Sequence, residues 1–189
     1  NSTRSTDFIT PKSRTSKTFR NQVLALAKHH PFARKLVNSG RLSMPSFLTD
    51  SVLNTPDADV FAGQMVPGAP MDDAPVQVNG QDAWLLDQVG KGFQCLLFVD
   101  AAPSAETLAT LQAFQQGAVS VETLIVSPVA LSVPGWTVVV DAQGWMAKRY
   151  DAQAGTVYLL RPDQHVLARW RQLQPAAVQA AVARAICKA

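Results

Sequence analysis

The segment Phe93–Val99 is an almost unbroken run of apolar residues, FQCLLFV. A strand that is buried on both faces has this composition, whereas a strand with one solvated face alternates apolar and polar residues. Such strands lie inside sheets that carry helices on both faces. The run therefore predicts an α/β domain with a central sheet.

The segments around this run predict the rest of the domain. Asn79-Gly80 is a strong two-residue turn signal between two short apolar stretches. Further strands are expected at 76–78, 83–86, 123–126, 136–140, 156–161 and 165–171, and helices at 104–116, 144–150 and 174–188. A strand–helix–strand unit gives parallel strands, and the hairpin near the C-terminus adds antiparallel ones. The sequence thus predicts a mixed sheet with helices on both faces.

The first third of the chain has a different texture. A helix is expected from Ser16, which is a plausible N-cap, with an apolar stripe at residues 19, 23, 26 and 27. A second short helix is expected at 31–38. Residues 42–80 are rich in proline and glycine and predict an irregular connector. We place the boundary between a segment 1–64 and a domain 65–189.

Charge is distributed unevenly along the chain. Residues 1–50 hold nine Lys and Arg against two Asp, and residues 51–100 hold one Lys against seven Asp. Because the early basic residues alternate with apolar ones at helical spacing, a solvated helix face is favoured over nucleic-acid binding, and packing on an acidic surface is a third possibility. No apolar run reaches 18 residues and no hydrophobic signal region is present, so a membrane is not expected as a partner. Nucleic acid is not expected either, because the solvated helix face is the favoured explanation of the basic residues.

Cysteine chemistry has little support in the sequence. The chain has two cysteines, Cys95 in the buried run and Cys187 near the C-terminus, and neither belongs to a Cys-x-x-Cys motif. Two cysteines are too few for a disulfide scaffold, so the cytoplasm is the expected compartment. Both are interpreted as structural.

Other candidate groups favour structural roles as well. The adjacent His29 and His30 project in different directions on a helix and cannot easily hold one metal ion, and His165 is expected to be exposed on a strand. The pairs Asp57/Asp59 and Asp72/Asp73 are expected to be solvated turn residues, with calcium binding as the alternative. The Gly-x-Gly-x-x-Gly and phosphate-loop motifs are absent. We therefore expect no catalytic, cofactor-binding or metal-binding residue in this chain.

The order of elements resembles the thioredoxin fold, and residues 68–76 with the hairpin after them resemble its peroxiredoxin variant. In those families a reactive cysteine lies where the first buried strand turns into its helix, because the helix N-terminus lowers the thiol pKa. Here that turn reads Asp100-Ala101-Ala102-Pro103-Ser104, without a cysteine. The resemblance thus implies the fold without its thiol chemistry.

Several phrases resemble the C-terminal region of flavin-dependent aromatic-ring hydroxylases, the family of phenol monooxygenases. They are residues 5–11, 36–43, 53–57, 63–70 and, most specifically, 158–163 with 168–171. The resemblance implies a C-terminal domain that supports assembly and dimerisation and covers a separate FAD and substrate domain. FAD and NAD(P)H are implied for the parent enzyme and not for this chain. The alternative is a stand-alone thioredoxin-fold protein with a non-thiol ligand or interaction role.

Overall fold

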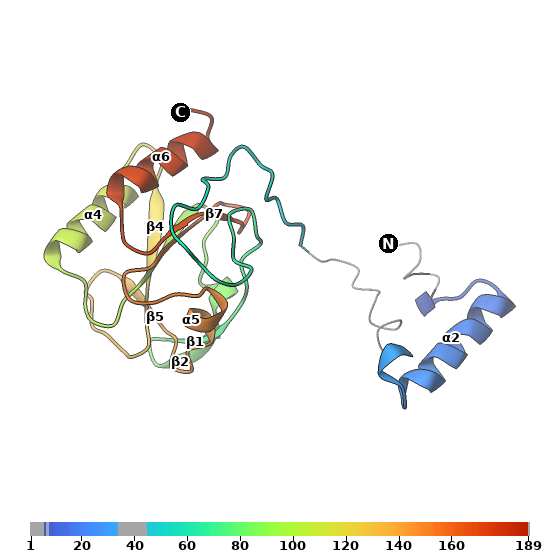
Figure 1. Cartoon of the computed structure of the whole chain (residues 1–189). Coiled ribbons are helices and arrows are strands. Elements are labelled where there is room, and N and C mark those ends of the chain that lie inside the picture. The colour runs from blue at the N-terminus through green and yellow to red at the C-terminus, as the bar shows by residue number, and fades with distance from the viewer. Residues whose placement is uncertain (1–5, 7, 34–44, 189) are drawn as a thin grey trace. The chain divides into compact units, whose positions relative to one another are not determined.

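The computed structural model describes residues 6, 8–33 and 45–188 of the 189-residue chain. The chain divides into two compact units, Asn1–Pro45 and Ser46–Ala189, and each is described by itself (Figure 1).

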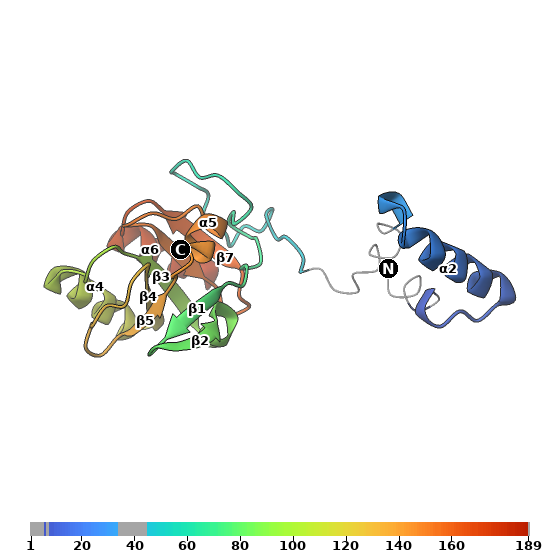
Figure 2. The same cartoon turned by 90° about the horizontal axis from the view of Figure 1, so that it is seen from below.

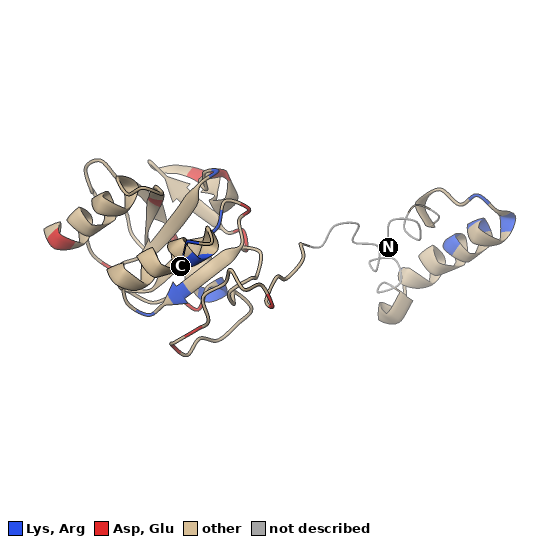
Figure 3. Cartoon of the chain, turned by 90° about the horizontal axis from the view of Figure 1, so that it is seen from above, with Lys and Arg blue, Asp and Glu red and all other residues tan. Residues whose placement is uncertain are grey.

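The first unit is built around helix α2, Arg14–Ala27. Its N-cap is Ser13, whose side-chain oxygen accepts a hydrogen bond from the backbone N–H of Ser16, so the expected start at Ser16 is three residues too late. The charged residues of the helix are all basic (Figure 3). Residues 31–33 are helical, and the remainder of the helix expected at 31–38 lies outside the described residues.

The apolar stripe of α2 differs from the predicted one. Val23 is buried, but Phe19 and Leu26 expose 59% and 43% of their surface. Residues 16, 20, 23 and 27 are the less exposed positions, a set spaced by three and four residues that forms one helix face. Only half of the expected stripe therefore lies on the packed face, and Phe19 and Leu26 lie beside it.

The second unit contains a seven-stranded mixed sheet in the order β2-β1-β5-β4-β3-β6-β7. Its strands are β1 (Pro75–Val78), β2 (Gln81–Trp84), β3 (Phe93–Phe98), β4 (Val121–Ser127), β5 (Thr137–Val140), β6 (Val157–Leu160) and β7 (Val166–Trp170). Strands β3, β4 and β5 are parallel, and the outer pairs are antiparallel. The hairpin β1–β2 turns at Asn79 and Gly80, both with positive φ (52° and 74°), as predicted from that dipeptide.

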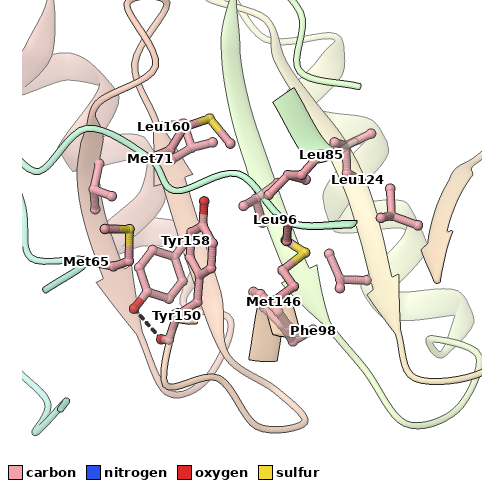
Figure 4. Close-up of a cluster of buried hydrophobic side chains, with 14 of the residues drawn as sticks. Met65, Met71, Leu85, Leu96, Phe98, Leu124, Met146, Tyr150, Tyr158 and Leu160 are labelled. Atoms are coloured by element: carbon pink, nitrogen blue, oxygen red, sulfur yellow. Dashed lines mark hydrogen bonds between the residues drawn. The ribbon is translucent and has the colours of Figure 1, made fainter. Parts of the chain in front are cut away.

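Helices cover both faces of this sheet (Figures 1 and 2). Helices α4 (Ala105–Gln115) and α6 (Pro175–Ala185) pack on one face, and the short α5 (Trp145–Arg149) lies on the other with the 3₁₀ turn Leu85–Asp87. Along β3, Cys95 and Leu97 face α4 and α6, whereas Leu96 and Phe98 belong to the opposite core cluster (Figure 4). The apolar segment Phe93–Phe98 is thus buried on both faces, as expected.

The boundary between the units lies between residues 45 and 46, whereas the sequence placed it between 64 and 65. The reason is that the connector, residues 46–74, is hydrogen-bonded to the domain from its start. The Thr55 N–H donates to the Leu167 carbonyl at 3.0 Å, and the Gly68 N–H donates to the Val166 carbonyl at 2.7 Å. The proline and glycine content of this segment predicts an irregular connector before the domain, but its backbone hydrogen bonds make it part of the domain.

Candidate functional site

The turn between β3 and α4 is the place where the resemblance locates a reactive thiol. It is the exposed segment 100–104, and Ser104 caps α4 by accepting a hydrogen bond from the Thr107 N–H at 3.1 Å. The helix N-terminus is therefore well formed, but the turn offers a carboxylate, two alanines, a proline and a serine instead of a thiol. Nothing in it can attack a disulfide or a peroxide as a thiolate would.

The two cysteines lie elsewhere. Cys95 is fully buried in the middle of β3, and Cys187 is exposed beyond the end of α6. Burial raises the pKa of the Cys95 thiol from 9.0 to about 12, with a smaller opposing effect from a Thr123 hydrogen bond. At neutral pH Cys95 is a neutral thiol packed as a small apolar residue.

The structure brings together a cluster of charged side chains around one aromatic ring, which we call the arginine clamp. It consists of Asp57, Asp59, Phe61, Arg169 and Arg171. Arg169 donates through Nε and Nη2 to the two carboxylate oxygens of Asp57, at 2.9 and 2.6 Å. Asp59 accepts from the backbone N–H of Arg171 at 2.8 Å. Arg169 of the edge strand β7 and Arg171, just beyond its end, thus bind connector residues that lie 112 positions earlier in the sequence.

The Phe61 ring contacts both guanidinium groups. Their central carbons are 4.4 Å (Arg169) and 3.8 Å (Arg171) from the ring centroid, which is the geometry of a stacked cation–π contact. Arg171 also pairs with Asp151, which accepts a hydrogen bond from the Ala62 N–H at 2.7 Å. This backbone hydrogen bond and then Arg171 hold the pKa of Asp151 below its usual value of 3.8.

A pair of buried tyrosines, Tyr150 and Tyr158 (Figure 4), adjoins the clamp through Tyr158, whose ring centroid is 5.9 Å from that of Phe61. Tyr158 donates to the Tyr150 carbonyl at 2.5 Å, and Tyr150 donates to the Asp72 carbonyl at 2.7 Å. Their rings meet edge to face with centroids 5.0 Å apart. Burial is the main reason that the pKa of each phenol is raised, so both are neutral donors. Because every charged group of the clamp already has a partner, the arrangement holds the connector on the domain and offers no free nucleophile or base.

The sequence interpretation of Asp57 and Asp59 as solvated turn residues misses their partners: Asp57 is exposed but pairs with Arg169 of β7, and the half-buried Asp59 accepts from the Arg171 N–H. Asp73 does have the expected turn role, because its Oδ1 accepts from the N–H groups of Ala74 and Leu86 at 2.9 and 3.1 Å. The signal that could have identified Asp57 and Asp59 is their spacing. The two acids are two residues apart, and so are the two arginines that they bind, Arg169 and Arg171.

His165 is also less exposed than expected. Only 15% of its side chain is exposed, and its ring nitrogens contact the carbonyl oxygens of Asp163 and Ser46 at 3.1 and 3.0 Å. Asp163 also pairs with Arg161 across the turn before β7. Burial alone would raise the pKa of Asp163, but the hydrogen bond and charge of Arg161 outweigh it and lower that pKa. This turn, the most specific phrase of the resemblance, is thus closed by its own ion pair.

His29 and His30 follow α2 and are exposed. Among residues 6, 8–33 and 45–188, no three His, Cys, Asp or Glu side chains are grouped so that they could hold a metal ion. No helix in the described part of the chain is long and apolar enough to cross a membrane.

Comparison with known proteins gives structural matches only. No protein-family model matches the sequence, and no curated protein matches it significantly. The flavin-dependent monooxygenase PieE, solved with FAD and substrate, matches 97% of this chain with a TM-score of 0.60 and 18% identity. Aklavinone-11 hydroxylase, solved with FAD and aklavinone, matches 72% of this chain with a TM-score of 0.55 and 19% identity.

The thiol peroxidase of Chromobacterium violaceum matches 65% of this chain and 89% of its own, with a TM-score of 0.54 and 11% identity. The fold is thioredoxin-like. The chain spans about a third of the PieE structure (32%) and a quarter of the aklavinone hydroxylase (25%). At these identities the matches establish the fold, which confirms the α/β, thioredoxin-like prediction with a helical segment before it.

Proposed function

We propose that this chain is a non-catalytic, thioredoxin-like C-terminal domain of a flavin-dependent aromatic-ring monooxygenase. Its role is to support assembly of the enzyme and to cover a separate domain that binds FAD and the substrate. The observation that carries the proposal is the match of 97% of the chain, both units included, to about a third of one FAD-dependent monooxygenase. The thiol peroxidase match, in contrast, extends over 65% of the chain.

The chemistry of the turn before α4 supports a role without thiol turnover. A thioredoxin-like enzyme needs a thiolate at that helix N-terminus. This chain has Asp100 to Ser104 there, and its buried cysteine has a pKa of about 12. The fold is retained and the group that gives it redox activity is not.

Helix α2 supports a role in assembly. It exposes Phe19 and Leu26 on one side, two helical turns apart, next to basic residues. Large apolar side chains exposed together mark contact surfaces. We assign this surface to the FAD and substrate domain in the parent enzyme and to a second copy when the chain is alone, since two-fold dimers are the commonest closed assembly.

The competing function is that of a stand-alone thioredoxin-fold protein with a ligand or interaction role. Residues 46–188 favour it in one respect, because they contain the whole seven-stranded sheet and both of its core clusters. Such a protein would bind its partner without any flavin domain.

The two functions can be distinguished by whether the gene encodes a longer polypeptide with an FAD-binding region. The test is to purify that polypeptide and the 189-residue chain, and to measure NAD(P)H oxidation and hydroxylated product with a panel of phenols. The proposal expects substrate-stimulated oxidation by a longer gene product and none by the chain. A gene product that lacks an FAD-binding region upstream of these residues would support the stand-alone protein instead.

A further inference from the structure

The turn of the hairpin β1–β2 consists of Asn79 and Gly80, and both residues are exposed. In a turn with two central residues, the hydrogen bond joins the residues on either side of them, here Val78 and Gln81. The Gly80 N–H takes no part in that bond. Within the described part of the chain, neither this N–H nor the Asn79 carboxamide has a hydrogen-bond partner, so both groups are available to react with each other.

An asparagine carboxamide and the N–H of the next residue are the two groups that form a cyclic imide. The reaction requires the following peptide nitrogen to rotate toward the carboxamide carbon, and a side chain on the following residue hinders that rotation. Gly80 has no side chain, and a Cβ built there would meet no atom within 4 Å. The turn therefore leaves space for the nitrogen of Gly80 to reach Cγ of Asn79.

The other two asparagines of residues 6, 8–33 and 45–188 are held differently. Asn54 is 7% exposed, and its Nδ2 donates to a backbone carbonyl at 2.7 Å. The N–H of the following Thr55, a β-branched residue, donates to the Leu167 carbonyl at 3.0 Å. Asn21 lies within α2, and its Oδ1 accepts from Arg20 at 3.2 and 3.1 Å. Both are thus fixed by hydrogen bonds that Asn79 lacks.

The hairpin β1–β2 also lies where local opening is easiest. It is at the edge of the sheet, and the register joins it to β5 through two residue pairs, Gln77 with Val140 and Val78 with Val139. Exposed ends of edge elements open at a much lower free energy than the core of a sheet. The rotation that brings the two groups together therefore needs little of the fold to open.

We propose that Asn79 is a site of spontaneous deamidation in the native chain. The backbone nitrogen of Gly80 forms a bond to Cγ of Asn79, and the carboxamide nitrogen leaves as ammonia with the proton of the Gly80 N–H. Water then opens the imide at either of its two carbonyl carbons, and the ring nitrogen regains a proton. The products are an aspartyl and an isoaspartyl residue at position 79, and no oxidant or enzyme is required.

The two products affect the hairpin differently. An aspartyl residue keeps the turn, because Asp-Gly is favoured in two-residue hairpin loops as Asn-Gly is. An isoaspartyl residue lengthens the main chain by one carbon, so a two-residue loop no longer fits between Val78 and Gln81. Because Val78 packs against the core cluster that contains Leu96, the isoaspartyl form loosens the edge of that core. The site is independent of the proposed monooxygenase role, so either can hold without the other.

The test is incubation of the 189-residue chain at pH 8 and at pH 6, followed by digestion with an endoprotease that cleaves before aspartate and not before isoaspartate. Residues 73–81 are released as one peptide from the unmodified chain. Mass spectrometry should show this peptide cleaved before position 79 in the aspartyl form, and whole but with the mass of the acid in the isoaspartyl form. Both products should appear faster at pH 8, because the attacking nitrogen must lose its proton, and Asn21 and Asn54 should stay unconverted.

The matched control is Asn79→Gly, which removes the carboxamide but keeps a favoured turn sequence, so its peptide should not change during incubation. Incubation in guanidinium chloride gives the rate without the fold. The native rate should lie within roughly tenfold of it, since the end of an edge hairpin opens at little cost. An Asn79 that persists in the native chain but converts in guanidinium chloride would overturn the proposal. So would native conversion of Asn54 at the same rate.

The effect on the hairpin is tested separately. The isoaspartyl form, separated by ion exchange, should unfold at a lower temperature than Asn79→Asp, which has the same charge and an ordinary main chain. Equal unfolding temperatures would show that the longer main chain does not disturb the hairpin.

Discussion

Arg169 and Asp57 form a bidentate ion pair with hydrogen bonds of 2.9 and 2.6 Å. The Arg169 side chain is 3% exposed, and that of Asp57 is 28% exposed. The pair therefore joins the connector to the edge strand β7 through a buried guanidinium and a partly exposed carboxylate. A buried guanidinium depends on its carboxylate, because without it the charge remains desolvated and uncompensated.

Replacing Asp57 by Asn should consequently lower the free energy of unfolding by about 3 kcal/mol. This is the lower end of the loss known for removing one partner from a buried ion pair. Urea unfolding at pH 7 measures this. Asp50→Asn is the matched control, since Asp50 is an exposed acid of the same connector, and it should change stability by less than about 0.5 kcal/mol. Equal effects of the two substitutions would contradict the role of the clamp.

Asp151 gives a pH dependence with a defined sign. Its folded pKa is below 3.8 because of the Ala62 N–H and Arg171, so the unfolded chain binds more protons as the pH falls. The stabilisation is complete above pH 3.8 and is lost as the pH falls through the lowered value. The stability difference between the unmodified chain and Asp151→Asn should therefore shrink when unfolding is measured from pH 7 down to the acid limit of folding. A difference that grows on acidification would reverse the sign and refute the interpretation.

Gly68 lies where two parts of the connector, near residues 48 and 68, approach each other closely. Its φ is +89°, and a Cβ there would lie 2.4 Å from the Leu48 carbonyl oxygen. Gly135 has a similar φ of +82° but open space around it. Gly135→Ala should cost about 1 kcal/mol, the strain of a left-handed alanine, and Gly68→Ala about 3 kcal/mol or more, because a backbone clash is added. Thermal unfolding of both variants separates the two effects, and equal losses would show that the close approach is unimportant.

The cysteines should differ sharply in reactivity. Cys187 is exposed, whereas Cys95 is fully buried with a pKa of about 12. Since the thiolate is the reactive form, a thiol reagent at pH 8 should modify one cysteine rapidly and the other only on unfolding. Counting the modified thiols in the unmodified chain and in Cys187→Ser measures this. Peroxide consumption or insulin-disulfide reduction that disappears in Cys95→Ser would show that the buried cysteine is redox-active after all.

Much of the fold follows from local patterns. The apolar run at β3, the Asn79-Gly80 turn and the late hairpin each specify their own geometry, so their elements lie where the sequence predicts them. The connector could not be predicted in this way. Asp57 and Asp59 look like turn residues, and their partners Arg169 and Arg171 are 112 residues away, a distance over which no periodicity operates.

The packed face of α2 and the Gln94–Glu122 contact were missed for related reasons. Hydrophobicity predicted Phe19 and Leu26 as buried, but the packed face also includes residues 16 and 20, a serine and an arginine. The arginine reaches the Ile9 carbonyl at 3.3 Å. The sequence predicts Gln94 only as one residue of a buried apolar strand. Only the register of β3 against β4 shows that Glu122 lies beside it.

The central claim is that this thioredoxin-like chain is the non-catalytic part of a flavin monooxygenase. Its most direct test is the ratio of FAD to protein, measured by flavin absorbance after FAD saturation and gel filtration, in the 189-residue chain and in the polypeptide that its gene encodes. The account predicts a colourless chain and a longer, yellow gene product with close to one FAD per polypeptide. Stoichiometric FAD on the chain alone, or a gene product that binds none, would contradict it.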